Sequence, residues 1–395
     1  MRQINESEVV EFLSDLVRIP SVNPPGNERP VADLIVEKLR ATGLQTRLIE
    51  AERKRPNVVA HVHGTTGGTS LLLNGHMDTF PAGPGWKVDP FGAKIVDGKL
   101  YGRGALDMKG GLAAMIMSVL AICRSEVGLD GDLIVMAVAD EIAGGYKGTG
   151  YLVQQKAVTA DMGVVCEPTG PDVYVAHRGA LWIELTTVGR SAHGGRPWLG
   201  VNAISKMAKV IAVIERELPL KLSKKKHWIL PSPTFNIGLI QGGDMVNMVP
   251  GKCRVEIDRR MIPGETSEEA TKEIVSILDK LKKEDDELQF FIRKTMELEA
   301  GEIRPTERIV LECKKAYQDI TGEEPGIGCT AGFEDAHFLI HGANIPTAMF
   351  GPYSKAPARD QRFETVSGTP EEHVEISELI KATKVYAKLI LNILR

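Results

Sequence analysis

Acidic residues and one histidine follow short apolar runs at three places in the chain, and these residue types bind divalent metal ions. His76 and Asp78 come after one apolar run, Asp140 and Glu141 after a second, and Glu167 after a third. His76 offers an imidazole nitrogen to a metal, and the Asp78 carboxylate could hold the other ring nitrogen. Taken alone, this pair is a weak signal, because a histidine after a strand is more often a packed or capping residue.

Asp107 adds a carboxylate from the glycine-rich stretch 101–111, just before an expected helix. The simplest alternative is that Asp107 caps this helix. Four or five carboxylates in one crevice would repel one another strongly, so several would have to take up protons or lie far apart unless a cation binds between them. The cluster therefore indicates a metal site more strongly than any single motif does.

The elements that must position these residues are short apolar strands that alternate with helices. This alternation predicts an α/β fold, with a mostly parallel sheet covered by helices on both faces. Ligands bind beyond the carboxyl ends of the strands in such sheets, which is where the acidic residues fall. We expect strands over 57–61, 71–74, 132–139 and 162–166, and helices over 8–18, 31–42 and 110–123.

The pattern changes after about residue 177, and the 395-residue length favours two domains. Alternating strands over 181–188, 234–241 and 253–259, with helices over 201–217 and 267–282, indicate a smaller antiparallel α+β domain. The tail from residue 304 returns to helix, strand and glycine-rich loops. The sequence therefore predicts a domain over 179–295 that is inserted into a larger one formed by 1–178 and 296–395.

The overall composition argues against nucleic-acid and membrane partners. The formal net charge is −4, so no global positive field attracts either, and the short basic run 224–226 is typical of a solvated loop. Five cysteines without a C-x-x-C spacing fit reduced thiols. No apolar run reaches the roughly 18 to 20 residues that span a bilayer, and no apolar leader precedes the first helix. We expect a cytoplasmic, unanchored protein.

Six motifs in order carry a resemblance to a known family. The chain resembles the zinc metallopeptidase and deacylase family of acetylornithine deacetylase, succinyl-diaminopimelate desuccinylase, carboxypeptidase G and aminoacylase, over nearly its whole length. The motifs are G-H-M-D-T (75–79), Y-G-R-G-x-x-D-M-K-G-G (101–111), A-D-E (139–141), C-E-P-T (166–169), S-A-H-G-G-R-P-x-x-G-x-N-A-I (191–204), and N-x-V-P (247–250) followed by D-R-R-x-x-P (258–263).

The resemblance implies a catalytic domain with an inserted ferredoxin-like lid and dimerisation domain. It also implies a two-zinc site whose bridging hydroxide attacks an amide carbonyl. Carried over by motif, His76 and Glu167 would bind the first metal, and Asp107 would bridge both metals. Asp78 would orient His76. Glu141 would be the general base that takes a proton from the attacking water and returns it to the leaving amine.

Three residues of the inserted domain would complete the site by the same resemblance. His193 would reach the partner subunit's site in a homodimer and steady the tetrahedral oxyanion. Asn247 and Arg260 would bind the substrate, since a guanidinium suits the carboxylate of an acylated amino acid. The alternative for Arg260 is a surface ion pair on a strand.

The chain departs from the family at the two ligands of the second metal. Ile142 stands where relatives have a glutamate, and Gly368 stands where they have a histidine. Neither side chain can bind an ion, so we predict a single ion, Zn²⁺ or else Co²⁺ or Mn²⁺, at His76, Asp107 and Glu167.

Other histidines could in principle replace the missing ligands. His373 lies close to Gly368 in sequence, but we expect it to point elsewhere. His61 and His63 could chelate an ion from one face of a strand, although such a pair without a third ligand is more often structural. We expect neither to restore the second metal.

Two functions compete. The first is a one-metal amidohydrolase for a small N-acyl amino acid or dipeptide. The second is a catalytically impaired binding protein that keeps the fold. Glu141 and His193 serve turnover more than binding, so their presence favours the enzyme.

Overall fold

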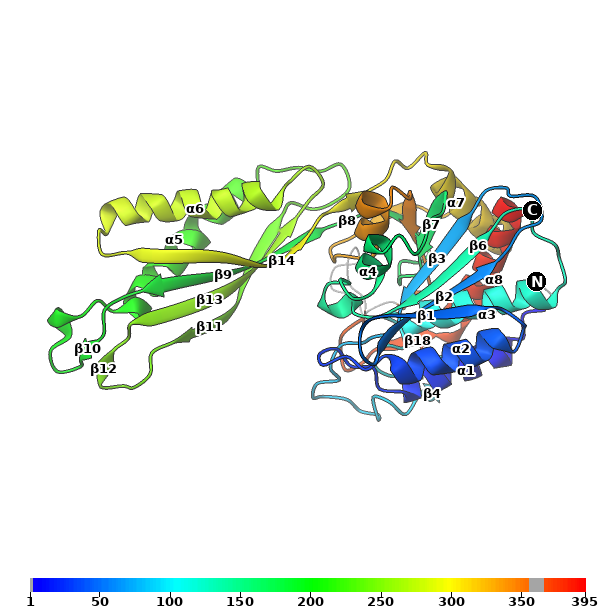
Figure 1. Ribbon diagram of the computed structural model, residues 1–395, viewed down its shortest axis with the longest axis horizontal. Coiled ribbons are helices and arrows are strands. Elements are labelled where there is room, and N and C mark those ends of the chain that lie inside the picture. The colour runs from blue at the N-terminus through cyan, green and yellow to red at the C-terminus, as the bar shows by residue number, and fades with distance from the viewer. Residues whose placement is uncertain (1–2, 355–365) are drawn as a thin grey trace. The chain divides into compact units, whose positions relative to one another are not determined.

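The computed structural model describes residues 3–354 and 366–395, and the chain divides into two compact units (Figure 1). The first unit comprises Met1–Val175, Glu302–Thr330 and Glu334–Arg395. The second comprises Ala176–Gly301 and Ala331–Phe333, so the insertion expected at 179–295 falls within it. Within the described ranges, no helix combines the length and apolar character needed to cross a bilayer.

A sheet of nine strands, counted over the described residues, forms the centre of the first unit. Its order is β1-β2-β6-β3-β7-β17-β8-β15, with β16 beside β8. The central strands β6, β3, β7 and β17 are parallel, whereas β1, β2 and β8 pair antiparallel. The bounds are β1 (Thr46–Glu52), β2 (Arg55–Val62), β3 (Leu71–His76), β6 (Leu133–Val138), β7 (Met162–Val165), β8 (Val173–His177), β15 (Gly301–Glu302), β16 (Ile327–Thr330) and β17 (Thr347–Met349).

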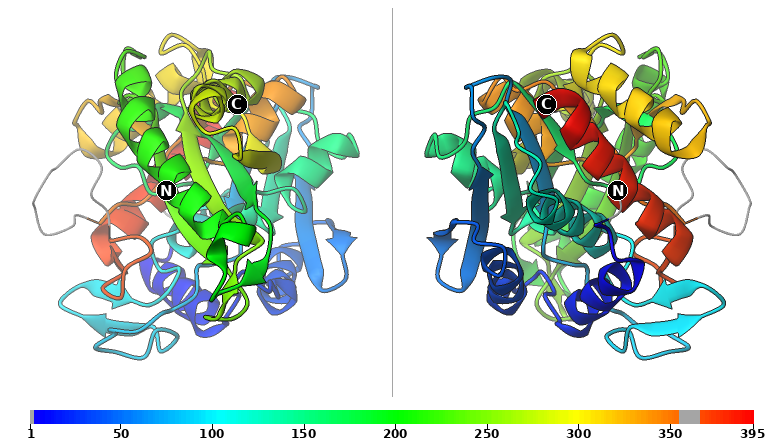
Figure 2. Two further views of the ribbon diagram at one scale, coloured as in Figure 1. Left: turned by 90° about the vertical axis from the view of Figure 1, so that its left-hand side faces the viewer. Right: turned by 90° about the vertical axis from the view of Figure 1, so that its right-hand side faces the viewer.

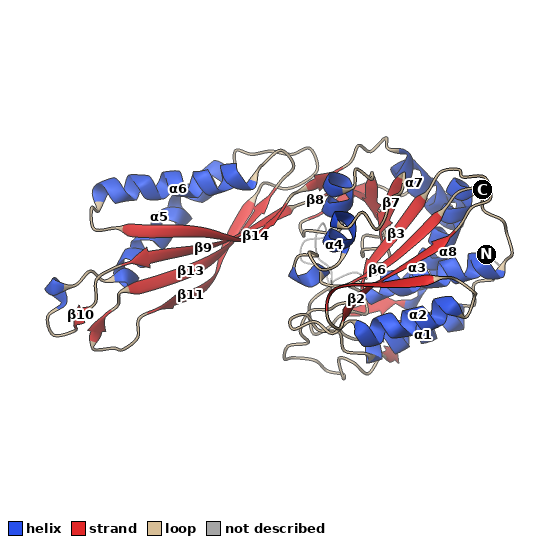
Figure 3. Cartoon of the chain, in the orientation of Figure 1, coloured by secondary structure: helices blue, strands red, loops and turns tan. Residues whose placement is uncertain are grey.

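Helices cover both faces of this sheet, as the sequence predicted (Figure 3). Alternate strand residues enter opposite cores, because successive side chains point to opposite faces. Leu71 and Leu73 pack into the larger core and Leu72 into the smaller one. The larger core lies under α1 (Glu6–Arg18), α2 (Arg29–Arg40), α3 (Lys109–Arg124), α7 (Arg308–Thr321) and α8 (Ile376–Leu394), and the smaller under α4 (Thr149–Gln154) and the π-helical turn η3 (Phe338–Gly342).

A small sheet in the order β18-β5-β4 adds to this unit. It consists of β4 (Lys94–Val96), β5 (Lys99–Tyr101) and β18 (His373–Glu375). The pairing of β18 with β5 joins the chain just before α8 to the segment that leads into the loop before α3. The right-hand view of Figure 2 looks onto the blue α1 and α2 and the red α8.

The parallel strands bring the predicted metal ligands to one edge of the sheet. His76 is the last residue of β3, Glu141 follows β6, and Glu167 follows β7. These three strands run parallel and side by side, so their carboxyl ends meet at the same edge. Asp107 reaches this edge from the loop that precedes α3.

The second unit has its own sheet and its own core. The four-stranded antiparallel sheet has the order β11-β13-β9-β14, and α5 and α6 pack on one face of it. Burial alternates along β13, where Cys253, Val255 and Ile257 enter the core. The bounds are β9 (Gly179–Val188), α5 (Ala203–Leu222), β11 (Thr234–Gly242), β13 (Lys252–Met261), α6 (Ser267–Glu284) and β14 (Gln289–Leu298), and the short strands β10 (Ala192–His193) and β12 (Met248–Val249) pair with each other.

Both helices of this unit begin at side-chain caps. Asn202 accepts a hydrogen bond from the Ser205 amide at the start of α5. Thr266 and Glu269 form a reciprocal capping box at the start of α6. The local sequence therefore specifies where each helix starts, independently of the packing that follows.

Candidate metal centre

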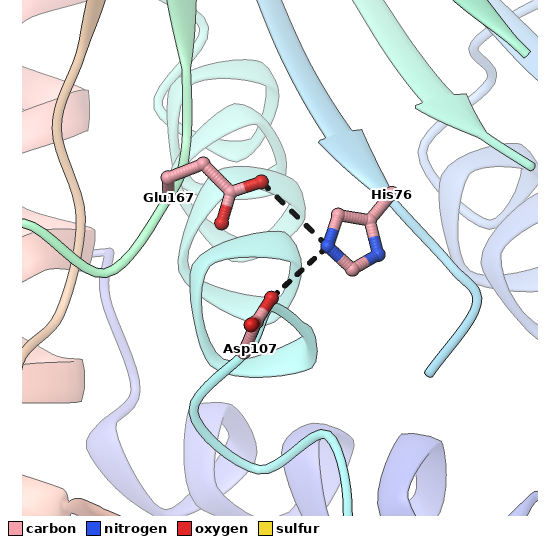
Figure 4. Close-up of side chains that lie close together, drawn as sticks. All are labelled: His76, Asp107 and Glu167. Atoms are coloured by element: carbon pink, nitrogen blue, oxygen red, sulfur yellow. Dashed lines mark hydrogen bonds and ion pairs between the residues drawn. The ribbon is translucent and has the colours of Figure 1, made fainter. Parts of the chain in front are cut away.

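An imidazole and two carboxylates converge at the carboxyl edge of the central sheet (Figure 4). Nε2 of His76 lies 3.1 Å from Oδ1 of Asp107 and 3.6 Å from Oε1 of Glu167. One ligand atom from each residue lies within 4.8 Å of the others. Ligand atoms on opposite sides of a divalent ion are about 4 to 5 Å apart, twice the metal–oxygen distance. The three side chains are therefore close enough to share one ion.

A main-chain oxygen fixes the ring of His76. Nδ1 lies 2.8 Å from the backbone carbonyl oxygen of Asp78 and 3.6 Å from Oδ1 of the Asp78 carboxylate. A carbonyl oxygen only accepts, so Nδ1 carries the proton, and Nε2 of the neutral ring keeps its lone pair. The Asp78 carboxylate, which was predicted from the sequence to hold this nitrogen, is thus farther from Nδ1 than the Asp78 carbonyl oxygen is.

The Asp78 carboxylate instead holds the chain around Glu141. It accepts hydrogen bonds from the amides of Glu141 and Ile142 at 3.2 Å each. It also accepts one from Nδ2 of Asn23 at 2.8 Å. These bonds fix the short 3-10 turn η1 (Glu141–Ala143) that follows β6, and with it the backbone from which the Glu141 side chain extends.

Asp107 does not cap the helix that follows it. The N-cap residue of α3 is Met108, whose side chain makes no capping hydrogen bond. Oδ2 of Asp107 instead accepts a hydrogen bond from Oγ of Ser367 at 2.5 Å. The Asp107 amide donates to Oε1 of Glu372 at 3.1 Å, and Glu372 forms a buried ion pair with Arg103. The capping alternative is therefore not observed, and the carboxylate is held toward His76.

Asp140 faces an arginine and not the cluster. Its Oδ1 lies 2.8 Å from Nη1 of Arg55, and Nε of Arg55 also donates to Oε2 of Glu28 at 3.0 Å. All three side chains are buried. Arg55 thus relieves the like-charge repulsion at Asp140. The crowding of carboxylates that was inferred from the sequence is therefore limited to Asp107, Glu141 and Glu167.

The remaining cluster carries unbalanced negative charge. Burial, together with nearby Glu334, raises the pKa of Glu141 and of Glu167 well above the usual range, although His76 opposes this. Burial would lower the pKa of His76, but the hydrogen bond to Asp107 and the charge of Glu167 raise it well above its usual value. A divalent cation would balance this charge directly.

Two acidic residues of this region, Glu334 and Asp335, were not predicted from the sequence. A carboxylate oxygen of Glu334 lies within 4.8 Å of ligand atoms of Glu141 and Glu167. Burial, reinforced by Asp107, raises the pKa of Glu334 to about 8. Oδ2 of Asp335 instead accepts a hydrogen bond from Thr149 at 2.8 Å. Both residues follow a strand, β16, but this strand is too short to stand out as an apolar run.

His193 and Asn247 lie together in the second unit, exposed to solvent. His193 is in β10, where it pairs with Met248 of β12. The Gly194 amide donates to the backbone oxygen of Asn247 at 2.7 Å. Nδ1 of His193 accepts from the Gly195 amide at 3.0 Å, so the proton of the neutral ring is on Nε2. Nε2 is therefore a hydrogen-bond donor.

Asn247 comes shortly before the first residue of β13, whereas Arg260 lies near the last residue of this strand. Nε of Arg260 is 3.0 Å from Oδ2 of Asp258, and its guanidinium group lies 5.1 Å from the centre of the Phe333 ring. The strand from Lys252 to Arg260 is roughly 25 Å long at ~3.3 Å per residue. Within one chain, Arg260 is thus too far from Asn247 for both to contact the same small substrate.

The structure describes both positions at which the sequence departs from the family, Ile142 and Gly368. The Ile142 side chain is half-buried in η1, and Gly368 has φ +73° with open space where a Cβ would stand. His373 contacts Tyr101, with ring centres 4.9 Å apart, while His61 and His63 stack on each other at 5.8 Å. Among the residues that the structure describes, none of these histidines belongs to a group of three metal-ligand atoms.

Comparisons with known proteins agree with this geometry. Residues 72–392 match the model of peptidase family M20/M25/M40. Acetylornithine deacetylase of Proteus mirabilis (strain HI4320) is 33% identical over 267 residues, which cover 65% of this chain and 68% of that protein. N-formyl-4-amino-5-aminomethyl-2-methylpyrimidine deformylase of Bacillus subtilis (strain 168) is 28% identical over 98% of this chain and 95% of its own.

Solved structures share the fold at low sequence identity. The dipeptidase Dug1p of Saccharomyces cerevisiae superimposes with a TM-score of 0.78 at 16% identity, over 98% of this chain and 96% of its own. The YxeP protein of Bacillus subtilis, a dinuclear metal-binding peptidase, gives 0.72 at 15% identity over 98% of each chain. The chain therefore belongs to peptidase family M20/M25/M40, whose members are hydrolases that act on amide bonds.

Proposed function

We propose that this protein is a metal-dependent amidohydrolase that cleaves the amide bond of a small N-acyl amino acid or dipeptide. The observation that carries the proposal is the convergence of His76, Asp107 and Glu167 on one point. Zn²⁺ is the ion that we expect there, with Co²⁺ or Mn²⁺ as alternatives, because one imidazole and two carboxylates are a donor set that zinc accepts.

An unsatisfied atom supports metal binding at this point. Oε1 of Glu167 is buried and accepts no hydrogen bond from any residue that the structure describes. A buried charged oxygen without a hydrogen bond is costly, and an ion between Glu167 and His76 would satisfy it. When bound, such an ion polarises an amide carbonyl and lowers the pKa of a water molecule.

Glu141 is the residue that we assign to proton transfer. Its Oε2 lies 3.6 Å from Nε2 of His76, and Asp78 holds its backbone in place. The raised pKa of Glu141 suits a group that takes a proton from water and then returns it to the leaving amine. Asp78 is a positioning residue in this proposal, because its carboxylate holds the backbone of Glu141 and its carbonyl oxygen holds the ring of His76.

We further propose that the complete site needs two chains. His193 and Asn247 lie at one end of the second unit and Arg260 near the other, so a single small substrate can meet all three only if they come from different copies. Nε2 of His193 would donate to the oxyanion of the tetrahedral intermediate. Arg260 would bind the substrate carboxylate with its planar fork. Three apolar side chains near His193 are exposed and offer an apolar surface for the partner: Trp198 and Leu199, which follow it in the sequence, and Val246, in the loop that leads to the paired strand β12.

The family and the relatives support the proposed substrate class. Those relatives act on an N-acetyl and an N-formyl compound by their names, and the fold neighbours include a dipeptidase. All of these substrates present a small acyl group on nitrogen.

A cytoplasmic location accords with five cysteines that are all free.

The test combines metal analysis with turnover. The purified protein should bind a divalent metal and hydrolyse at least one member of a panel of N-acetyl, N-succinyl and N-formyl amino acids and dipeptides. His76→Ala should lose both properties, whereas His61→Ala should keep both. Metal binding without hydrolysis of any amide would favour the alternative of a binding protein, and no metal binding at all would refute the proposed centre.

A further inference from the structure

We infer that a cavity on the small sheet β18-β5-β4 is a binding site for a neutral aromatic molecule that carries one hydrogen-bond donor. The cavity has a volume of about 600 Å³, which lies within the range of small-molecule sites. Its lining residues all belong to the first unit, and none of those that the structure describes is a candidate ligand of the metal centre. The inference therefore goes beyond the proposed function and does not rest on it.

One face of the small sheet forms the floor of this cavity. Successive side chains of a strand point to opposite faces. Val374 of β18 and Leu100 of β5 enter the larger core, so the residues that flank them lie on the opposite face. On that face the sheet lines the cavity with His373 and Glu375 of β18, Lys99 and Tyr101 of β5, and Val96 of β4.

His373 supplies an independent sign of a missing ligand. The residue is only 6% exposed, and it lines the cavity. Nδ1 lies 2.7 Å from the backbone oxygen of Glu371, which only accepts, so Nδ1 carries the proton of the neutral ring. Nε2 is therefore an acceptor, yet it is buried and makes no hydrogen bond with any residue that the structure describes. Because a buried acceptor without a donor is costly, we expect the ligand to supply the donor.

The state of the His373 ring agrees with this role. Burial, as the largest cause, lowers the pKa of His373 from its ordinary value. The ring is thus neutral at neutral pH and keeps the Nε2 lone pair that a donor needs. An N–H or O–H group of the ligand is the matching partner.

The charges around the cavity balance. Lys87 lies 3.5 Å from Glu371, and both side chains are exposed. Lys99 stands opposite Glu375 in the register of β5 and β18. Two cations and two anions give the site no net charge, so it favours neither an anion nor a cation. The other lining residues besides Tyr101 and His373 are apolar, which favours an uncharged and largely apolar ligand: Val88, Val96, Val366 and Pro370.

The two rings of the cavity favour an aromatic ligand. The ring centres of Tyr101 and His373 are 4.9 Å apart, and their planes are inclined by 37°. Aromatic rings pack on one another in offset or edge-to-face arrangements at such distances. A flat ring that joins this pair brings a donor on its edge to His373. Indole, with one ring N–H, is the simplest probe of this class.

The first experiment compares indole with 1-methylindole, in which a methyl group replaces the hydrogen of the ring N–H. Titrations followed by ligand-observed NMR measure both affinities for the full chain. Indole should bind the wild type roughly 3- to 10-fold more tightly, which is the effect of one net hydrogen bond. His373→Phe keeps an aromatic ring but has no acceptor, so it should bind the two compounds equally.

A matched pair of variants tests the location of the site. Val96 and Ile95 are neighbours in β4, both are partly exposed, and only Val96 lines the cavity. Val96→Trp should fill the cavity and abolish the binding of both compounds. Ile95→Trp makes a similar change on the opposite face of the strand and should leave both affinities unchanged. Wild-type affinity in Val96→Trp would overturn the assignment of the ligand to this cavity.

The remaining outcomes also decide the inference. No binding of indole to the wild type would reject an aromatic ligand. Equal affinity of the wild type for the two compounds would mean that Nε2 takes no donor from the cavity, as when an ordered water molecule serves it. Tighter binding of the charged compounds indole-3-acetate or tryptamine would reject a neutral ligand. None of these measurements uses a metal ion or turnover, so their result is independent of the proposed function.

Discussion

The two units present their chemical residues in opposite ways. In the first unit His76 and Glu167 are buried and Asp107 is half-buried, and hydrogen bonds from other segments hold His76 and Asp107. In the second unit His193 and Asn247 are exposed, and their nearest polar contacts are backbone groups of the same loops. We propose that the first arrangement receives an ion, and that the second completes a site only when it meets a partner copy.

The largest difference between the units should appear when a ligand is removed. His76→Ala in the first unit should abolish metal binding and lower kcat/KM by on the order of 10⁴-fold or more, because the other site residues act as a unit with the ion. Asn247→Ala in the second unit should leave the metal content unchanged. Metal analysis and steady-state kinetics measure both effects. Equal loss of metal in the two variants would contradict the contrast.

Charge pairs sharpen the comparison through stability. Arg55→Met would leave Glu28 and Asp140 buried without their partner, so we expect a loss of about 3 to 5 kcal/mol in the free energy of unfolding. Arg254→Met in the second unit breaks an exposed pair with Glu184 and should cost about 0 to 1 kcal/mol. Denaturant titrations of both variants give the two values. Similar losses would mean that the buried network is not structurally important.

Mixing two inactive variants tests whether the second unit acts in a partner. Glu141→Gln and His193→Ala should each lower kcat by roughly 10²- to 10³-fold alone, with metal content retained. After the two are unfolded and refolded together, half of the dimers contain one of each, and one of their two sites is intact. Activity should then recover to about a quarter of the wild-type value. No recovery would show that His193 does not serve the partner.

The smallest expected effect is a pH dependence confined to the metal-free protein. Burial raises the pKa of Glu334 to about 8 and, as the largest cause, that of Asp335 to about 7, from ordinary values of 4.5 and 3.8. The folded state thus binds protons that the unfolded state has released. The stability contribution is complete below the ordinary values and is lost as pH rises through 7 to 8.

The midpoint temperature of thermal unfolding should therefore decrease in the metal-free protein when the pH is raised from 5 to 8.5. Adding Mn²⁺ at pH 8.5 should restore it, since an ion replaces the protons as the source of positive charge. Asp335→Asn should weaken the pH dependence by removing one of the two groups. A metal-free protein with the same midpoint at both pH values would argue against charge crowding at this edge.

The sequence predicted the elements better than their pairing. Apolar runs such as 71–74 and 132–139 identified the buried strands, because a strand covered on both faces has no polar side. The sheet was expected to be mostly parallel, and the sequence did not show that the strand over 57–61, part of β2, pairs antiparallel with β6. Strand direction depends on the path of the chain between distant segments, and no local pattern records it. The boundaries of the inserted domain and its role as a lid stay predictions.

The site was predicted where motifs are local and missed where contacts are distant. His76 and Glu167 lie in short motifs at strand ends and Asp107 in a loop before a helix, and the three side chains lie close together, while their role as metal ligands stays a prediction. The pairing of Arg55 with Asp140 joins segments far apart in sequence, so the sequence alone left Asp140 in the cluster. Glu334 was missed because the strand before its loop, β16, is too short to stand out as an apolar run. The roles of Glu141, His193, Asn247 and Arg260 stay predictions.

The contact between Nδ1 of His76 and the carbonyl oxygen of Asp78 has a consequence for how this protein tolerates change. A side-chain acceptor disappears with a single codon, but a peptide oxygen is present whichever amino acid occupies position 78. The conformation of the backbone at position 78, and not the side chain there, therefore determines which nitrogen of the His76 imidazole carries the proton. Random substitution at position 78 would be felt first in the turn at Glu141, while the lone pair of the ring kept its direction.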